Sequence, residues 1–132
     1  MPVQIKYTDD GLGVRFIAHG IATGDEIIEA NKKVNTHENF SGLKYKIADR
    51  SACNEYRVSG EDVKIIAGQE REAAELNPEL VVAMIAPSDL QFGISRMYQS
   101  LMADMGFECE IFRSPEEADR WIAAKLETKG LR

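Results

Sequence analysis

The sequence has few of the residues and patterns that assign a function directly. It contains only two cysteines, Cys53 and Cys109, which are too few for a disulfide framework or for a zinc site built from cysteine. No apolar run approaches the roughly 18 residues of a membrane-spanning helix, and the first residues lack the apolar stretch of a secretory signal. Basic residues number 16 against 22 acidic ones, which argues against a general nucleic-acid binder because such proteins need a basic face. We therefore expect one cytoplasmic domain that spans residues 1–132, has no transmembrane segment and binds no nucleic acid.

Groupings of catalytic residues are also scarce. Neither His19 nor His37 has a carboxylate or a cysteine at a diagnostic spacing, and the sequence contains no G-x-S-x-G, P-loop or G-x-G-x-x-G motif. Cys53 lies in an expected loop, but the sequence around it does not indicate the lowered pKa and the oriented base that a catalytic thiol needs. Cys109 lies in an expected strand, where a cysteine is usually a small buried side chain. We predict that the protein is not an enzyme and has no catalytic residues, no cofactor and no metal site.

Alternating strand and helix patterns follow the chain. Two runs that alternate apolar and polar residues, 3–7 and 12–18, flank a turn rich in aspartate and glycine and predict an antiparallel hairpin. Further strands are expected at 44–49, 80–86 and 107–112, and helices at 24–36, 59–77, 89–105 and from Ser114 toward the C-terminus. The order β-β-α-β-α-β-α-β-α predicts an α/β fold with a mixed, mostly parallel five-stranded sheet, an N-terminal antiparallel hairpin and four helices.

Short sequence motifs support the predicted helix starts and one of the predicted strands. Segments 23–26 and 59–62 are typical of helix starts, and 114–117 combines a serine cap, a proline at the first helical position and a capping-box glutamate. The run 80–86 is almost wholly apolar, which is typical of a central parallel strand covered on both faces.

The expected third helix is unusually apolar. Between residues 90 and 103 its only charged side chain is Arg96, and a helix that is apolar around most of its girth is either deeply buried or covers something other than its own sheet. One interpretation is an ordinary crossover helix, with Arg96 reaching solvent or pairing with a carboxylate such as Asp49 or Asp89. The other is an apolar ligand pocket in which Arg96 holds an anionic head group. Under that hypothesis the apolar tail contacts three further side chains of the helix: Phe92, Met97 and Tyr98.

Polar residues at the end of the third strand form a second group of candidates. Asp49 and Ser51 lie at the edge where open α/β sheets place their ligands, and we include both among the expected ligand-binding residues. Ser59 follows at an expected helix N-cap, where a phosphate would meet free N–H groups and the positive end of the helix dipole. Ser59 is therefore a candidate phosphorylation site, with plain helix capping as the alternative.

Several short motifs occur together in one order and spacing. They comprise Gly20, Ser114 and Trp121 and the segments 23–26, 45–49, 59–62, 82–83, 92–98, 111–112 and 116–118. Over nearly its whole length the chain therefore resembles the SpoIIAA-like family, often described as STAS/SEC14-type domains. The resemblance implies an α/β sandwich with a mixed sheet and no known enzyme activity.

The resemblance implies two different functions. SEC14-type domains bind lipids or other hydrophobic molecules beneath a mobile helix. Anti-sigma-factor antagonists act by protein–protein contact and are switched by phosphorylation of a serine in an Asp-Ser-Ser-Gly motif. When Asp49 is aligned with their strand-end aspartate, residues 57–60 fall on that motif, but only Ser59 and Gly60 match it. This departure favours a small apolar or amphipathic, lipid-like ligand over the regulatory interaction module with a protein partner. A peripheral contact with membranes, and a homodimer formed through the third and final helices, are further expectations.

Overall fold

The computed structural model describes residues 3–104 and 108–130, and its elements follow the predicted order. One sheet contains β1 (Val3–Thr8), β2 (Gly13–Thr23), β3 (Tyr45–Arg57), β4 (Val81–Ile85) and β5 (Cys109–Phe112), in that spatial order. The helices are α1 (Gly24–Asn35), α2 (Gly60–Leu76), α3 (Asp89–Met102) and α4 (Pro115–Thr128), with short 3-10 turns η1 (Asp9–Gly11) and η2 (Phe40–Gly42). β1 is antiparallel to β2, and all other neighbours are parallel. The predicted fold class is confirmed.

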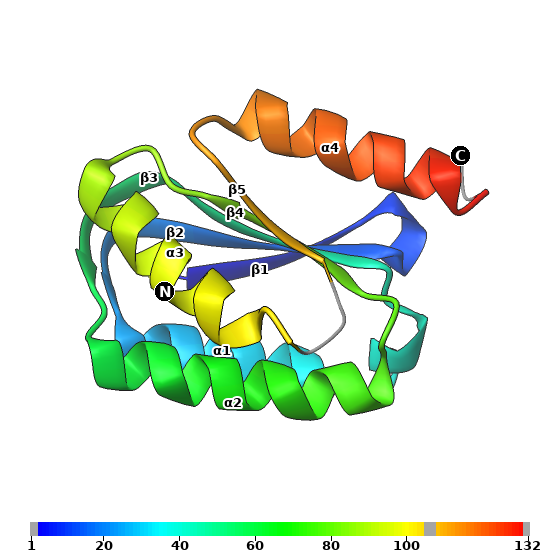
Figure 1. Ribbon diagram of the computed structural model, residues 1–132, viewed down its shortest axis with the longest axis horizontal. Helices are drawn as coiled ribbons and strands as arrows, with labels where there is room; N and C mark the ends of the chain where they lie inside the picture. Colours follow the sequence, from blue (N-terminus) through cyan, green and yellow to red (C-terminus); the bar gives the residue numbers. More distant parts are fainter. Residues whose placement is uncertain (1–2, 105–107, 131–132) are drawn as a thin grey trace.

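Helices cover the two faces of the sheet unequally. α1, α2 and α3 lie on one face and α4 lies alone on the other (Figure 1). On the three-helix face, Tyr98 and Met102 of α3 share a buried cluster with Val63 of α2 and Met84 of β4. On the opposite face, α4 packs its buried side chains Ala118, Ile122 and Leu126 against β3 and β4. The three-helix face therefore holds the larger core.

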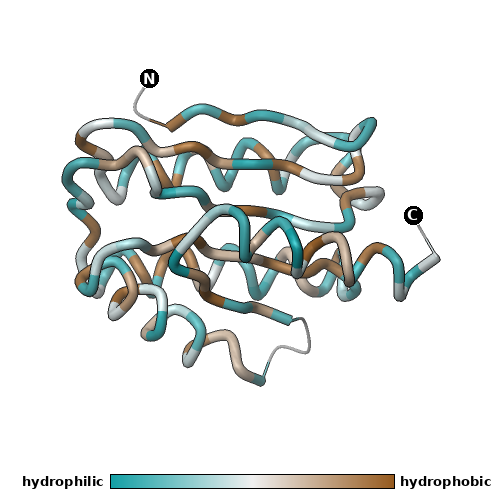
Figure 2. The backbone as a smooth tube through the Cα atoms, turned by 90° about the horizontal axis from the view of Figure 1, so that it is seen from above, coloured by the Kyte–Doolittle hydropathy of each residue, from teal (hydrophilic) through white to brown (hydrophobic). Residues whose placement is uncertain are grey.

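Strand alternation divides the side chains between these faces. In β4 all five residues are buried, with Val82 and Met84 facing the three helices and Ala83 and Ile85 facing α4. The prediction of a central strand covered on both sides is confirmed. The outer strand β1 instead alternates apolar and polar residues (Figure 2), as expected of an edge strand with one solvated face.

The helix-start signals act as predicted, with one difference. Thr23 and Ser59 each form a reciprocal capping box, with Glu26 and Asp62 respectively. Ser88 forms a third capping box, at the start of α3. Ser114 accepts a hydrogen bond from the Glu117 N–H, and Pro115 occupies the first turn. The Glu117 carboxylate, however, accepts from the Ser114 hydroxyl rather than from its backbone N–H.

Two strands extend well beyond their predicted ends. β2 continues to Thr23 and β3 to Arg57, where the two strands pair only with each other. Register shifts between Ile17 and His19 and between Gly20 and Ile21 break the simple period-two pattern that marks a strand in the sequence. Gly20 has a φ of 54°, a left-handed conformation that favours glycine. The prediction that Cys53 lies in a loop is therefore wrong, because it lies within β3.

The ends of two other elements differ slightly from the predictions. α3 ends at Met102 rather than near residue 105, and β5 begins at Cys109 rather than at 107. The predicted stop at Gly106, Met105 and the start of the predicted strand lie outside the described residues. Within the two described ranges, none of the helices is both long enough and apolar enough to cross a membrane.

Candidate functional site

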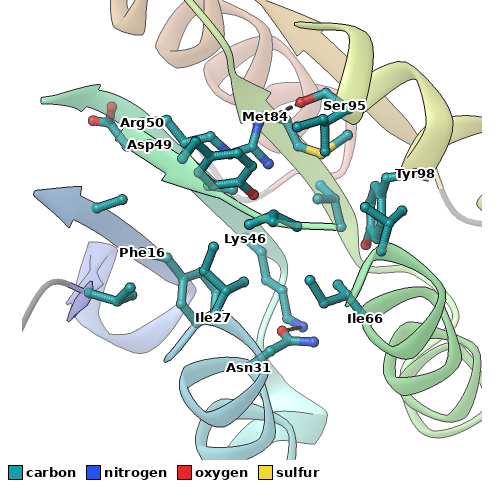
Figure 3. Close-up of a pocket in the computed structure, with 18 of the residues that line it drawn as sticks. Phe16, Ile27, Asn31, Lys46, Asp49, Arg50, Ile66, Met84, Ser95 and Tyr98 are labelled. Atoms are coloured by element: carbon teal, nitrogen blue, oxygen red, sulfur yellow. Dashed lines mark hydrogen bonds between the residues drawn. The ribbon is translucent and has the colours of Figure 1, made fainter. Parts of the chain in front are cut away.

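An apolar cavity lies between the sheet and the three helices that cover one of its faces (Figure 3). Its volume is about 80 Å³. Each of the three helices and the four strands β1 to β4 contributes to the wall. The apolar wall residues are Val3, Phe16, Ala18, Ile27, Ala48, Tyr56, Val58, Val63, Ile66, Val82, Met84, Ile94 and Tyr98. Protein interiors are normally close-packed, so an apolar void in the main core marks this face as the candidate site.

The size of the cavity limits what enters it without rearrangement. Ligand pockets usually measure about 300–1,000 Å³, and an engineered cavity of about 150 Å³ binds benzene. A volume of about 80 Å³ therefore holds only a few heavy atoms of a ligand. A longer ligand has to displace wall side chains or move one of the covering helices.

A buried ion pair closes one end of the cavity. Lys46 Nζ lies 2.7 Å from Glu70 Oε1, and these residues are only 2% and 1% exposed. Lys46 also donates to Asn31 Oδ1 (2.9 Å) and Asn35 Oδ1 (2.6 Å), and both amide groups donate to Glu70 Oε1. Among the described residues, no hydrogen bond of ordinary geometry reaches the other Glu70 oxygen. The two charges thus compensate each other within one network built from α1, α2 and β3.

The environment shifts the pKa values of both ion-pair partners. Burial lowers the pKa of Lys46, and the nearby Glu70 carboxylate offsets only part of this effect. For Glu70 burial alone would raise the pKa, but the charge of Lys46 and the hydrogen bonds from Lys46, Asn31 and Asn35 bring the net shift below the usual value. The lowered pKa of Glu70 favours its ionised form, which the Lys46 ammonium at 2.7 Å stabilises.

Two other ionisable groups near the cavity stay neutral. Burial and, secondarily, the Glu70 carboxylate raise the pKa of Tyr98 well above 10. The same two causes, in the same order, raise the pKa of Cys109 to about 12. A thiol with such a pKa is a poor nucleophile. Cys109 lies in a strand as predicted, but it is half-buried rather than buried.

Arg50 is a charged wall residue that has no carboxylate partner among the described residues. It is 8% exposed, donates a hydrogen bond to the hydroxyl of the fully buried Ser95, and stacks its guanidinium 4.8 Å above the ring of Tyr56. Figure 3 shows it at the end of the cavity away from the Lys46 ammonium. Arg50 also borders an outer pocket, which lies between residues 50–56 of β3 and residues 87–91 at the start of α3. Its side chain thus stands between the cavity and the surface.

Comparisons with known proteins identify the fold. No protein-family model and no curated protein matches the chain. Among solved structures, the chain is similar to an uncharacterised protein of the DUF3478 family from Shewanella loihica PV-4, which is described as having a SpoIIAA-like fold. The match covers 90% of both chains with a TM-score of 0.57 and 16% identity. The protein has a SpoIIAA-like fold. The predicted resemblance is confirmed at this level, and an identity of 16% shows the fold alone.

Within the SpoIIAA-like fold, the predicted strand-end residues face away from the cavity. Asp49 borders the cavity, but its carboxylate accepts hydrogen bonds from Arg15 Nε (3.0 Å), from the Ser51 N–H (2.9 Å) and from the Ser51 hydroxyl (2.6 Å). Arg15 also pairs with Asp119 of α4, so this cluster belongs to the α4 face. Ser51 is exposed and borders the outer pocket.

The four predicted α3 residues do not form one cluster. Tyr98 is in the cavity wall, whereas Arg96 is exposed and borders a shallow depression with Gln99 and Ser100. Met97 is 44% exposed, and Phe92 is half-buried beneath the guanidinium of Arg113. Residues 96 and 98 are about 200° apart around a helix that turns about 100° per residue, so they point in opposite directions. The structure therefore separates Arg96 from the cavity.

Arg96 lies at the surface, and its predicted ligand-binding role stays a prediction. Arg96 extends to solvent, as the first interpretation expects. It pairs with neither predicted carboxylate, because Asp49 is bound by Arg15 and Asp89 by Arg113 at 3.1 Å.

Ser59 is exposed at the start of α2, where its hydroxyl accepts a hydrogen bond from the Asp62 N–H at 3.1 Å. Capping accounts for this contact, and phosphorylation of Ser59 stays a prediction. The two helices of the expected homodimer, α3 and α4, lie on opposite faces of the sheet, and the homodimer stays a prediction. In the described part of the chain, no group of three or more histidine, cysteine or acidic side chains is arranged to hold a metal ion.

We expect Asp49→Asn to lower the free energy of unfolding at pH 7 by about 1.5–3 kcal/mol, the usual range for hydrogen bonds to a charged group. Burial alone would raise the pKa of Asp49, but the hydrogen bonds from Ser51 and the pairing with Arg15 bring it below its usual value of 3.8. Stability from a lowered carboxyl pKa is present above the unfolded-state pKa and is lost as pH falls through the folded-state pKa.

Urea denaturation between pH 7 and pH 2 tests this expectation. The stabilities of wild type and Asp49→Asn are expected to converge below about pH 4. Asp119→Asn removes the exposed partner of the same arginine, and should cost less than about 1 kcal/mol. Parallel curves for wild type and Asp49→Asn over the whole range would show that the Asp49 charge contributes no stability.

Proposed function

We propose that this protein is a non-enzymatic binding domain for a small hydrophobic or amphipathic, lipid-like ligand. The observation that carries the proposal is the apolar cavity enclosed by β1 to β4 and the three helices α1, α2 and α3. Apolar pockets with a few polar groups are the usual form of small-molecule sites. The polar groups here are the Lys46–Glu70 pair at one end and the Arg50 guanidinium at the other.

The chemistry of the wall supports binding rather than catalysis. Among the described residues, those that line the cavity include no histidine and no cysteine. His19 and His37 are both exposed, and His37 stacks against Tyr7 near the hairpin turn. In the part of the chain that the structure describes, the other charged groups of the wall are already paired, and the Arg50 guanidinium offers N–H donors and no acceptor. These features favour a site that holds a molecule without transforming it.

The expected affinity follows from the apolar area that a ligand buries. Each methylene transferred from water contributes about 0.8 kcal/mol, so a tail of about eight methylenes gains about 6 kcal/mol. The loss of translational and rotational freedom offsets about 4 kcal/mol or more of this gain. The remaining gain of about 2 kcal/mol or less corresponds to dissociation constants of roughly 30 mM or weaker from apolar contact alone. Tighter binding requires a favourable contact with the head group.

A cavity-filling substitution tests the proposal. Ala48 lies in the wall on β3 between Phe16 of β2 and Met84 of β4. We expect Ala48→Leu to fill the void and to weaken binding of 1-decanol about tenfold or more, while thermal stability stays equal or rises. Isothermal titration calorimetry and thermal denaturation provide these two measurements.

The control is Ala124→Leu, which makes the same change on an exposed position of α4 and should leave decanol binding unchanged. Native mass spectrometry of the purified protein before and after organic extraction adds a check for a ligand already bound. Equal decanol affinity in wild type and Ala48→Leu would place any binding elsewhere. A wild-type protein that binds neither alcohols, fatty acids nor phospholipids would refute the proposed function.

A further inference from the structure

One charged group of the cavity wall has no direct partner of opposite charge among the described residues. Lys46 and Glu70 compensate each other at 2.7 Å, and Asp49 is compensated by Arg15 on the α4 face. Arg50 remains, 8% exposed, without a carboxylate partner in the described part of the chain. The cavity wall therefore holds one buried cation that no carboxylate contacts directly in the described part of the chain. Burying such a charge is unfavourable unless an anion approaches it.

The protein contacts of Arg50 leave room for another partner. A guanidinium has five N–H donors, and the contacts of Arg50 in the described structure are one hydrogen bond to the neutral Ser95 hydroxyl and a stacking contact with the Tyr56 ring. Neither contact neutralises the charge. A planar fork of donors matches the two oxygens of a carboxylate or phosphate.

The position of Arg50 suits a head group that enters from the surface. Its side chain borders both the cavity and the outer pocket, and the outer pocket includes Ser88 and Gln91 at the start of α3. The positive end of a helix dipole favours an anion there as well. The acidic side chain that borders this pocket, Glu55, is already paired with Arg57 at 2.7 Å.

We propose that Arg50 binds the anionic head group of a single-chain amphiphile whose apolar tail occupies the cavity. This inference rests on the proposed function and adds the chemical class of the ligand. Residues 46 and 50 lie four positions apart on the same side of β3, a distance of about 13 Å along a strand. The Lys46–Glu70 network closes the far end. Because the cavity of about 80 Å³ holds only a few heavy atoms, a medium-length chain enters by displacing wall side chains, and a long chain fits less well.

The experiment compares decanoate with 1-decanol, which have tails of equal length and differ in charge. Isothermal titration calorimetry is applied to the wild type, to Arg50→Gln and to the control Arg96→Gln, which neutralises the exposed arginine of α3. We expect Arg50→Gln to weaken decanoate binding about tenfold or more, the usual size of a lost charged hydrogen bond. Decanol affinity should change by less than about twofold, and Arg96→Gln should leave both affinities unchanged.

Further titrations test which anionic group binds, whether the apolar tail is needed, and which tail length fits best. Decyl phosphate is expected to bind in the same Arg50-dependent way, whereas inorganic phosphate and acetate are expected not to bind measurably. If inorganic phosphate binds as tightly as decyl phosphate, Arg50 belongs to a simple anion site. That result would refute the proposal that the ligand is an amphiphile. Hexadecanoate that binds more tightly than decanoate would overturn the limit on chain length.

The variant Arg50→Lys keeps the positive charge and tests the proposal if Arg50→Gln does not fold. If circular dichroism shows that Arg50→Gln is unfolded, Arg50→Lys is expected to keep the preference for decanoate over decanol, and added salt should weaken only decanoate binding. Equal losses for decanoate and decanol in Arg50→Gln, or no preference for decanoate in the wild type, would refute the role of Arg50 and leave the proposed function standing. A wild type that binds neither compound would refute both.

Discussion

Replacing Lys46 with methionine is expected to lower the free energy of unfolding by about 3–5 kcal/mol, the cost of leaving one partner of a buried ion pair without the other. The Glu70 carboxylate is 1% exposed, and without the Lys46 ammonium it keeps only uncharged hydrogen-bond donors, such as the amides of Asn31 and Asn35, among the described residues. Domains of this size are usually stable by about 5–15 kcal/mol. Urea denaturation at pH 7 should therefore show a much lower midpoint with little change in slope.

The double variant Lys46→Met/Glu70→Leu is the control for this prediction. Replacing a whole buried ion pair with apolar side chains of similar size is often neutral or stabilising. The double variant is therefore expected to recover most of the stability lost in Lys46→Met. A single variant that loses less than about 1 kcal/mol, or a double variant that is less stable than the single one, would contradict the view that the two charges compensate each other.

Local sequence signals predicted most of the fold. The capping residues Thr23 and Ser59 and the apolar run around β4 act within a few residues of themselves, so a sequence pattern is enough to detect them. The ends of β2 and β3 were missed because those segments are strands only by pairing with each other. Two register shifts in the β2–β3 pair, at each of which β3 carries one extra residue, hide the alternation that would otherwise have marked the end of β3.

The candidate site was predicted only in part. An apolar α3 suggested a ligand pocket with one cation, and Tyr98 does lie in the cavity wall. The cation chosen, Arg96, faces solvent, and the arginine of the cavity wall is Arg50. Alternation along β3 places residues 46, 48 and 50 on one side of the strand. This pattern in the sequence was enough to place Arg50 on the same face as residues 46 and 48.

The alternation alone did not identify Lys46 and Arg50 as core-facing residues, because buried lysine and arginine side chains are rare. Lys46 is tolerated in the core through Asn31, Asn35 and Glu70, which come from helices 11 to 24 residues away in the sequence. No local pattern reveals such partners. The polar groups of the site therefore depend on tertiary contacts, whereas its apolar wall follows from strand and helix periodicity.

Gly13→Ala is expected to destabilise the protein by about 1–3 kcal/mol, the usual cost of forcing extra atoms into a packed site. Gly13 is the register partner of Tyr45 in the β2–β3 pair, and a Cβ at Gly13 would overlap the Tyr45 ring. The ring has little freedom to move, because it is 3% exposed and its hydroxyl bonds to Thr8 and Asp9 at 2.6 Å each. Thermal and urea denaturation measure the loss.

A double-mutant cycle distinguishes this clash from a general effect of alanine. Tyr45→Ala alone should cost about 3–5 kcal/mol, as for other large buried aromatic residues. Since Tyr45→Ala also removes the ring that the new Cβ meets, the double variant should lose at least about 0.5 kcal/mol less than the sum of the two single variants. Gly93→Ala, in α3 with nothing within 4 Å of the added Cβ, should instead stabilise by about 0.5–1 kcal/mol. Strict additivity of Gly13→Ala and Tyr45→Ala would exclude the overlap as the cause, because independent sites add and neighbours in contact do not.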